Sequence, residues 1–287
     1  MELKRLQMEN CLLEKSLEEI KTHYRKDLNL GGWFSFNSTK TEWQNFYAEK
    51  MLNHFFNSEM IDKAFKGFTI SPELLITNNI SFLGLKNKSV LIVGGGPSTS
   101  LLTKDQISKY DYIVSCNHFF KNPTLKETRI DLCLIGDEVN LQSKEFLDYI
   151  ETFKPAIGFE HSARRTDQDL IKFRKNYPKC FVYLTRYFSR LGFVARAIII
   201  CALAKPNKID YIGMDGHKKG SYAHAFQPGK PAPVFNEEQK YKEQVEIFFK
   251  YLFKDVNLHK DSICDLGKSH SDNLYHSILE KVKKHEE

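Results

Sequence analysis

Short apolar runs alternate with amphipathic stretches through most of the chain. From Lys88 onward, runs rich in apolar and β-branched residues are followed by longer stretches with apolar positions three and four apart. This alternation predicts βαβ units, and therefore an α/β fold with a doubly wound, mostly parallel sheet of the Rossmann-like kind. The apolar runs predict strands at 89–93, 112–115, 132–135, 156–159, 181–184, 210–212 and 262–265. The intervening stretches predict helices at 98–109, 143–153, 166–176, 193–204, 236–253 and 271–284.

The first 87 residues follow other patterns and form an N-terminal helical extension. Over residues 1–28 one heptad position holds Leu3, Asn10, Leu17 and Tyr24, and the other holds Leu6, Leu13 and Ile20. This spacing is typical of a coiled coil and predicts a homo-oligomer; a single amphipathic helix packed on its own domain is the alternative. Residues 29–87 are rich in aromatic side chains, which we expect to pack helices against the sheet. The remaining segment, 88–287, is the predicted Rossmann-like domain.

Composition narrows the class of protein. The 287 residues are 41% hydrophobic and carry a formal net charge of +6, with the basic residues spread along the chain. That balance does not require nucleic acid as a partner. The six cysteines form no CxxC pair, so we expect a reducing compartment and no zinc site. The opening residues lack the apolar segment of a signal peptide, and no apolar run is long enough to span a membrane. We expect a cytoplasmic protein, with peripheral attachment to the inner face of the membrane as a further candidate.

A glycine-rich turn follows the first predicted strand. Gly94, Gly95 and Gly96 allow a sharp turn, and Pro97 and Ser98 suit the first turn of a helix. Strand, glycine turn and helix N-terminus together predict a phosphate site, where free N–H groups and the helix dipole face an anion. The dinucleotide fingerprint is incomplete, because Thr99 stands where its third glycine would be and no acid ends the second strand. NAD and the common methyltransferase arrangement are therefore disfavoured. No GxxxxGK(S/T) sequence occurs, so a P-loop nucleoside triphosphatase is disfavoured as well.

Polar residues follow several predicted strands, at the edge where open α/β sheets bind their ligands. They occur at 94–98, at 117–118, at 136–138 and at 213–217. Four polar strand ends at one edge predict a nucleotide site. Its candidate residues are Gly94, Gly95, Gly96, Pro97, Ser98, Asn117, His118, Asp137 and Gly213.

These motifs carry a family resemblance. Val-Gly-Gly-Gly-Pro-Ser at 93–98, Cys-Asn-His-Phe at 116–119, Leu-Gly-Phe at 191–193 and Ile-Asp-Tyr-Ile-Gly-Met-Asp at 209–215 resemble the bacterial CMP-sialic-acid-dependent sialyltransferases. They are also similar to the related motility accessory factors, proposed to move nonulosonic acids from CMP onto flagellin. Ile-Cys-Asp-Leu-Gly at 263–267 resembles the last strand of those families. The resemblance covers roughly residues 88 to 280.

The resemblance implies a glycosyltransferase that uses a CMP-activated sugar acid. The glycine turn would border the cytidine phosphate, Asn117 would hydrogen-bond the nucleotide or the donor sugar, and Gly192 would start a helix lining the nucleotide pocket. Asp215 would lie at a strand end beside the ligand, as a further catalytic candidate. The family's catalytic histidine falls between the strand that ends near Asp215 and the next helix, which by region implies His224, with His217 as the alternative; a histidine suits proton transfer near neutral pH.

The donor, the acceptor and several contacts are left open. Gly136-Asp137-Glu138 and Leu191 differ from the family's Asn-Pro-Ser and Ser at these places, so sialic acid, Kdo, pseudaminic acid or another CMP-linked acid fits as donor. The acceptor would be a glycan, glycolipid or protein in surface-glycan assembly, such as lipopolysaccharide or capsule. Further candidates for binding phosphate or carboxylate groups are Tyr222, Lys218, Lys219, Arg164, Arg165, Arg186 and Arg190.

No cofactor is expected, and Mg²⁺ is not expected to be obligatory. The Asp167-Gln-Asp169 sequence matches a metal-binding pattern, but acids at a helix start also suit the helix dipole. Two alternatives to the transferase remain. One is a pterin pyrophosphokinase that uses ATP and Mg²⁺, with Asp137, Glu138 and Asp215 as metal ligands. The other is a non-catalytic, oligomeric nucleotide-binding scaffold.

Overall fold

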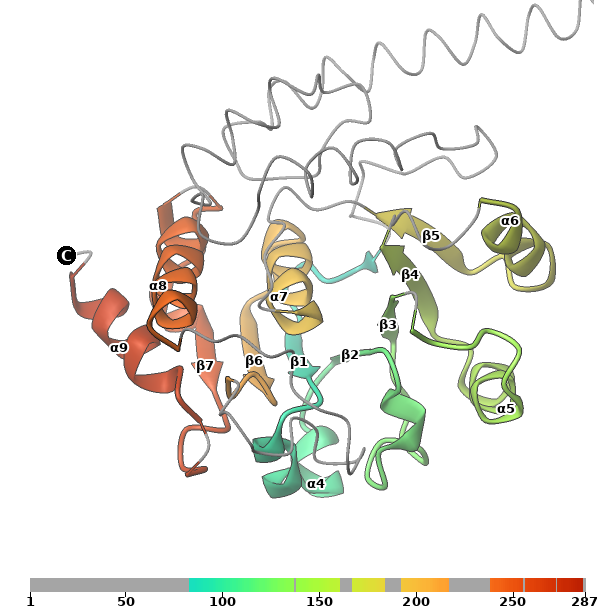
Figure 1. Ribbon diagram of the computed structural model, residues 1–287, viewed down its shortest axis with the longest axis horizontal. Helices are drawn as coiled ribbons and strands as arrows, with labels where there is room; N and C mark the ends of the chain where they lie inside the picture. The colour runs from blue at the N-terminus through green and yellow to red at the C-terminus, as the bar shows by residue number, and fades with distance from the viewer. Residues whose placement is uncertain are drawn as a thin grey trace, which may run out of the picture.

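The computed structural model describes residues 83–136, 138–160, 167–183, 192–216, 238–254, 256–271 and 273–285. The predicted coiled-coil helix over 1–28 lies outside these residues, as does almost all of the aromatic-rich extension over 29–87. Element labels follow Figure 1.

Seven parallel strands form one sheet in the order β5-β4-β3-β2-β1-β6-β7. The strands are mostly apolar throughout, as expected where helices cover both faces of a parallel sheet. The predicted doubly wound α/β sheet is therefore confirmed, and each predicted strand is present within two residues of its bounds. The strands are β1 (Ser89–Val93), β2 (Tyr112–Cys116), β3 (Leu132–Ile135), β4 (Ala156–Glu160), β5 (Cys180–Tyr183), β6 (Lys208–Ile212) and β7 (Ile263–Asp265).

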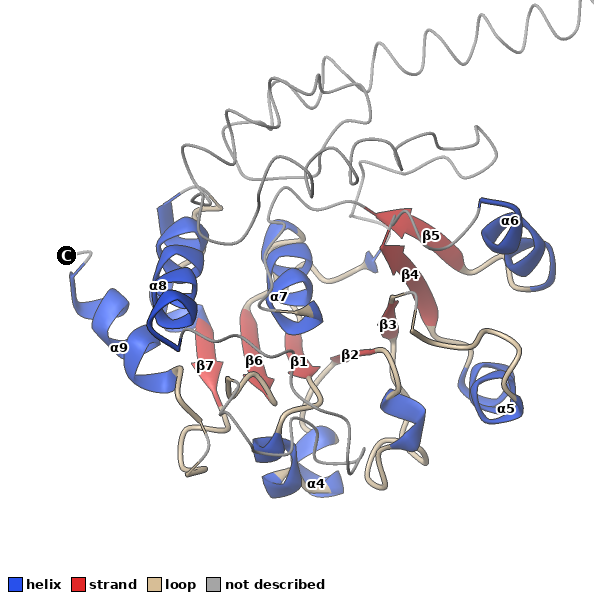
Figure 2. Cartoon of the chain, in the orientation of Figure 1, coloured by secondary structure: helices blue, strands red, loops and turns tan. Residues whose placement is uncertain are grey.

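Helices cover the two faces of the sheet in separate groups (Figures 1 and 2). One apolar core lies between the sheet and the helices α7 (Phe193–Leu203), α8 (Glu238–Lys254) and α9 (His276–His285). The other core lies on the opposite face. It is closed by α4 (Lys104–Ile107), η6 (Phe119–Lys121), α5 (Lys144–Phe153) and α6 (Asp167–Asn176). The 3-10 helix η5 (Pro97–Leu101) precedes α4. A short 3-10 turn, η7 (Lys260–Ser262), precedes β7.

The most apolar helix, α7, explains how the centre of the sheet is buried. It contacts β1, β2 and β6, and every residue from Val194 to Ala202 is buried, including the basic Arg196. The helix is too short to cross a bilayer, and among the described residues no helix is both long and apolar enough to do so.

The single helix predicted over 98–109 is wrong. The chain instead forms the 3-10 helix η5, passes through an extended residue at Leu102, and begins the short helix α4 at Thr103. The cause is local hydrogen bonding. The Thr103 hydroxyl accepts the N–H of Gln106, and the Gln106 side chain accepts the N–H of Thr103, which forms a capping box and starts a new helix. The helix that the sequence predicts directly after the glycine turn is therefore reduced there to the five-residue 3-10 helix η5.

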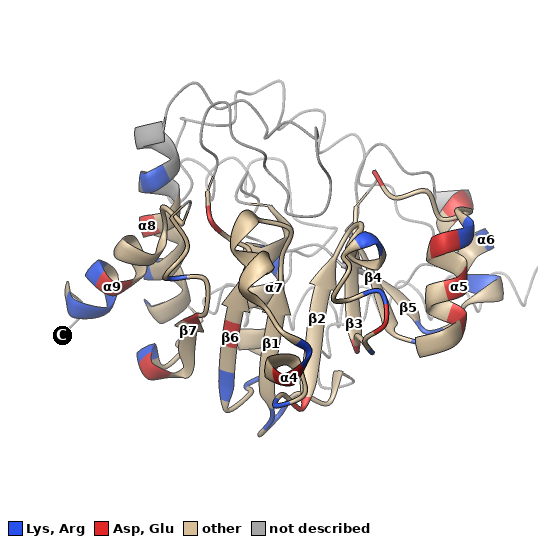
Figure 3. Cartoon of the chain, turned by 90° about the horizontal axis from the view of Figure 1, so that it is seen from below, with Lys and Arg blue, Asp and Glu red and all other residues tan. Residues whose placement is uncertain are grey.

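Polar contacts also fix the amino-terminal half of β6, far from the polar strand ends. Figure 3 shows its basic and acidic positions, which are Lys208 and Asp210. The buried Asp210 carboxylate accepts a hydrogen bond from the Tyr110 hydroxyl at 2.5 Å and pairs with the Lys208 ammonium at 2.6 Å. Both contacts are made by Oδ2 of this buried carboxylate, which is thereby paired within the strand's amino-terminal half.

Candidate functional site

The topology reverses next to β1. The chain proceeds from β1 through β5 toward one side of the sheet and then returns at β6 on the other side of β1. In open α/β sheets ligands bind at such a reversal, outside the carboxyl ends of the strands. Here the two flanking segments are the glycine turn at 94–99, defined as the β1 loop, and residues 213–216, defined as the β6 loop.

Hydrogen bonds join the β1 loop to the end of β6 and to the β6 loop. The N–H of Gly94 donates to the carbonyl of Ile212 at 2.8 Å, and the N–H of Gly96 donates to the carbonyl of Gly213 at 3.1 Å. The Thr99 hydroxyl donates to the carbonyl of Gly94 at 3.1 Å and closes the turn on itself. These two glycine N–H groups, which the sequence predicts to face a phosphate, are thus bonded within the protein.

The glycines are required by this contact between loops. A Cβ on Gly94 would lie 2.5 Å from Cγ2 of Val194 and 2.6 Å from the carbonyl oxygen of Gly213. A Cβ on Gly96 would overlap the Asp215 carboxylate and the same carbonyl. Gly213 itself has a φ of +82°, and a Cβ there would lie 2.5 Å from the Thr99 hydroxyl. The β6 loop therefore fills the space that a Cβ on Gly94 or Gly96 would take.

Ser98 and Asp215 complete the junction. The N–H of Ser98 donates to Oδ2 of Asp215 at 2.8 Å, and the Ser98 hydroxyl accepts the N–H of Gly213 at 2.9 Å. Both side chains are buried, so these bonds are shielded from water. The Asp215 carboxylate thus occupies the anion position that the sequence predicts for a phosphate at Ser98. Asp215, expected beside the ligand as a catalytic candidate, is placed as the residue that holds the β1 loop.

Asn117 joins the ends of β2 and β3. It has a φ of +50°, a left-handed conformation that asparagine tolerates better than most residues. Its side-chain oxygen accepts the N–H of Gly136 at 2.9 Å, and its side-chain nitrogen donates to Oε1 of Glu138 at 2.5 Å. His118 follows, with its ring 5.9 Å from that of Phe120. The structure thus brings Asn117, His118 and Glu138 together at the carboxyl edge of the sheet.

The start of α7 lies against the ends of β1 and β3. Gly192 precedes the helix with a φ of +84°, and a Cβ on Gly136 would lie 2.7 Å from the Phe193 ring. Gly192 therefore starts a helix at this edge, as the resemblance implied. One turn along the helix, the guanidinium of the buried Arg196 lies 5.2 Å from the centre of the Phe193 ring. Sequence reasoning missed Arg196, although it is the one cation within an apolar helix.

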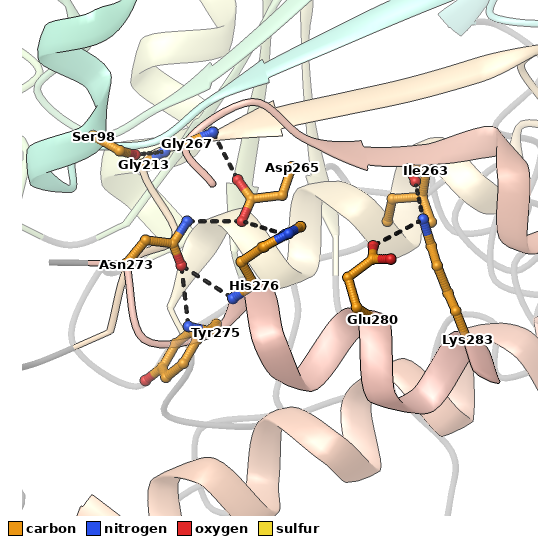
Figure 4. A network of polar contacts seen from close by, with 10 residues as sticks. All are labelled: Ser98, Gly213, Ile263, Asp265, Gly267, Asn273, Tyr275, His276, Glu280 and Lys283. Carbon is orange, nitrogen blue, oxygen red and sulfur yellow. Dashed lines mark hydrogen bonds and ion pairs between the residues drawn. The ribbon is translucent and has the colours of Figure 1, made fainter. Parts of the chain in front are cut away.

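A second polar group surrounds the end of β7 (Figure 4). Asp265 is buried, and its oxygens accept the N–H of Gly267 at 2.8 Å and the side-chain N–H of Asn273 at 2.7 Å. Nδ1 of His276 lies 3.8 Å from Oδ2 of Asp265. Burial raises the pKa of Asp265, while the bonds from Asn273 and Gly267 act in the opposite direction. Sequence reasoning missed this group, although Asp265 ends a predicted strand.

The remaining candidates lie outside the described residues and stay predictions. They are His217, His224, Asp137, Lys218, Lys219, Tyr222, Arg164, Arg165, Arg186 and Arg190. Within the described ranges, no three histidine, cysteine, aspartate or glutamate side chains are grouped to hold a metal ion.

Comparisons with known proteins bear only on the fold of the chain. No protein-family model matches it, and no curated protein matches it. Among solved structures it is similar to the sialyltransferase CstII from Campylobacter jejuni, determined in complex with the substrate analogue CMP-3FNeuAc. The two share 15% sequence identity, the match covers 63% of this chain and 83% of that chain, and the TM-score is 0.46.

Proposed function

We propose that the chain is a glycosyltransferase that moves a sugar acid of the sialic, nonulosonic or Kdo type from a CMP-activated donor to a glycan, glycolipid or protein acceptor. The observation that carries the proposal is the gathering of the motif residues at one edge of the sheet. Asn117 and His118 follow β2, the β1 loop follows β1, and Gly192 starts α7 beside them. These are the motifs that resemble the CMP-sialic-acid-dependent enzymes.

The reaction needs few groups from the protein. An acceptor hydroxyl oxygen attacks the anomeric carbon of the donor, the bond from that carbon to the phosphate oxygen breaks, and CMP leaves with the electron pair. A general base takes the proton of the acceptor hydroxyl. In this proposal Asn117 binds the nucleotide or the donor sugar, and the bonded β1 and β6 loops form a rigid border beside it.

Binding of CMP is the first test. Calorimetry with CMP should show saturable binding, and thermal shift with CMP should exceed the shift with UMP or with ATP and Mg²⁺. CMP should also be released from CMP-N-acetylneuraminate or CMP-Kdo, with or without a chelator. No binding at millimolar CMP would refute the proposal. A shift with ATP and Mg²⁺ alone would select the pyrophosphokinase, and no shift with any nucleotide would select the scaffold.

Two asparagines give a matched pair of variants. Asn117 and Asn87 both have a positive φ, 50° and 64°, but Asn87 precedes β1 at the opposite edge of the sheet. Glycine at either position keeps the backbone conformation and removes the amide. Asn117→Gly should weaken CMP binding about tenfold, equivalent to roughly one lost hydrogen bond. Asn87→Gly should leave CMP binding unchanged, and equal effects of the two variants would contradict the assigned role.

A further inference from the structure

A histidine and a buried carboxylate face each other at the carboxyl end of β7. Nδ1 of His276 is 3.8 Å from Oδ2 of Asp265, whose side chain is only 1% exposed. The carboxylate is fixed in place because both of its oxygens accept hydrogen bonds, from Gly267 and Asn273. Asn273 also accepts the backbone N–H of His276 at 3.1 Å, so the backbone that carries the ring is held by the same residue.

The ring of His276 is buried at one edge and exposed elsewhere. Nδ1 is fully buried and has no hydrogen-bond partner among the described residues, whereas 29% of the side chain is exposed. A buried nitrogen without a partner is costly, and a small rotation of the ring would let an Nδ1–H donate to Asp265. Hydrogen bonds at catalytic groups are often long before substrate binds. With its proton on Nδ1, the ring would present Nε2 as an acceptor.

This pair belongs to the same edge as the β1 and β6 loops. The N–H of Leu274 donates to the carbonyl of Asp215 at 2.7 Å. A Cβ on Gly216 would lie 2.9 Å from the Tyr275 ring, and one on Gly267 would lie 2.5 Å from the Ser98 hydroxyl. The segment that carries His276 is therefore packed directly against the two loops at the topological reversal.

We propose that His276 is the proton acceptor of the transfer reaction and that Asp265 is its positioning residue; this rests on the proposed function. Nε2 of His276 takes the proton from the acceptor hydroxyl while the acceptor oxygen bonds to the anomeric carbon. The bond from that carbon to the phosphate breaks, and the electron pair leaves on CMP. The resulting imidazolium is stabilised by the Asp265 carboxylate, as in other pairs of histidine and aspartate. The loop residues His217 and His224 are the competing candidates.

The charged groups around the ring come from three elements. Asp265 lies on β7, Asp215 follows β6 and acts on the Asp265 carboxylate, and Glu280 lies one turn along α9. The Tyr211 hydroxyl is buried on β6, and burial raises its pKa well above the usual value. Tyr211 therefore stays neutral, and Glu280 is itself paired with the Lys283 ammonium at 3.6 Å.

A matched pair on the surface provides the control. Nδ1 of His259 also lies 3.8 Å from Oδ2 of an aspartate, Asp261, but these side chains are 78% and 91% exposed and precede β7 at the opposite edge. The variants are H276Q, H276A, D265N, H259Q, H217Q and H224Q in the full chain. The assay is CMP release from CMP-N-acetylneuraminate and CMP-Kdo as a function of pH, with calorimetry of CMP binding and urea unfolding to check the site and the fold.

Loss of the proton acceptor should lower kcat about 100-fold in H276Q, with CMP affinity unchanged. Added imidazole should restore part of the rate of H276A, and D265N should lower kcat more than it changes KM. The rise of rate with pH should disappear in H276Q and persist in H259Q. Wild-type rates in H276Q, or a loss confined to variants of His217 or His224, would overturn the proposal. A wild-type chain that neither binds nor releases CMP would overturn the proposed function as well.

Discussion

Gly213 meets two separate steric demands, and its replacement by alanine tests whether the β1 and β6 loops pack as described. Its φ is +82°, which L-residues rarely adopt, and a Cβ would lie 2.5 Å from the Thr99 hydroxyl and 2.8 Å from the backbone carbon of Gly94. The left-handed backbone costs about 1–2 kcal/mol, and overpacking costs about 1–3 kcal/mol. Gly213→Ala should therefore lower the free energy of unfolding by about 2–5 kcal/mol.

Two other glycines separate the contributions. Gly84 has a φ of +63° with nothing within 4 Å of an added Cβ, so Gly84→Ala should show the backbone cost alone, about 1–2 kcal/mol. At Gly94 the φ is not in the left-handed region, but a Cβ would lie 2.5 Å from Val194. Gly94→Ala should therefore show the packing cost alone, about 1–3 kcal/mol.

Urea unfolding of the three variants and the wild type gives the comparison. A lower midpoint at unchanged slope reports a loss of native stability. The sum of the losses in Gly84→Ala and Gly94→Ala should approach the loss in Gly213→Ala. If Gly213→Ala were no less stable than Gly84→Ala, the β6 loop would not lie against the β1 loop, and the reasoning about Asp215 would fail with it.

Three further changes test single contacts by the same unfolding assay. Asp215→Ala should cost about 2–3 kcal/mol because it leaves the buried N–H of Ser98 without its charged acceptor. Ser98→Ala should cost about 1–3 kcal/mol because a loop amide loses its acceptor, and no loss would show that the hydroxyl is not bonded there. Glu246 accepts bonds from Lys250 and Lys281, which lower its pKa, so its stabilisation is present above the unfolded pKa and is lost as the pH falls through the folded pKa. Glu246→Gln should cost about 0.5 kcal/mol at neutral pH and nothing in acid; an equal cost at both would contradict the assignment.

The strands could be predicted because each side chain in a parallel sheet covered on both faces meets the same apolar surroundings. Val90 to Val93 and Leu132 to Ile135 are buried throughout, so the sequence signal is a continuous apolar run. The polar strand end at Asn117 could be found for a related reason. In a parallel sheet the carboxyl ends of all strands lie at one edge, and chain order alone places them there.

The loop contacts could not be predicted, because they join residues far apart in the sequence. Ser98 and Asp215 are 117 positions apart, and nothing local to Gly96 indicates that a carboxylate fills the space beside it. Applying the strand-end rule to β7 would have found Asp265. The proximity of His276 to Asp265 depends on the turn that Asn273 stabilises before α9, and the predicted helix start at 271 missed that turn.

Stability and CMP affinity should therefore depend on different residues, although the sequence assigns all of these residues to one nucleotide site. The N–H groups of Gly94, Gly96 and Ser98 are bonded to the β6 strand end and loop, so replacing these glycines should destabilise the fold. The molecules that remain folded should then bind CMP as the wild type does. Asn117→Gly should weaken CMP binding, and its loss of stability should be limited to the two hydrogen bonds that the amide makes to Gly136 and Glu138, because its backbone conformation is preserved. Calorimetry of CMP binding by the folded fraction tests this expectation. A glycine variant that folds fully but no longer binds CMP would show that the glycine turn contacts the phosphate.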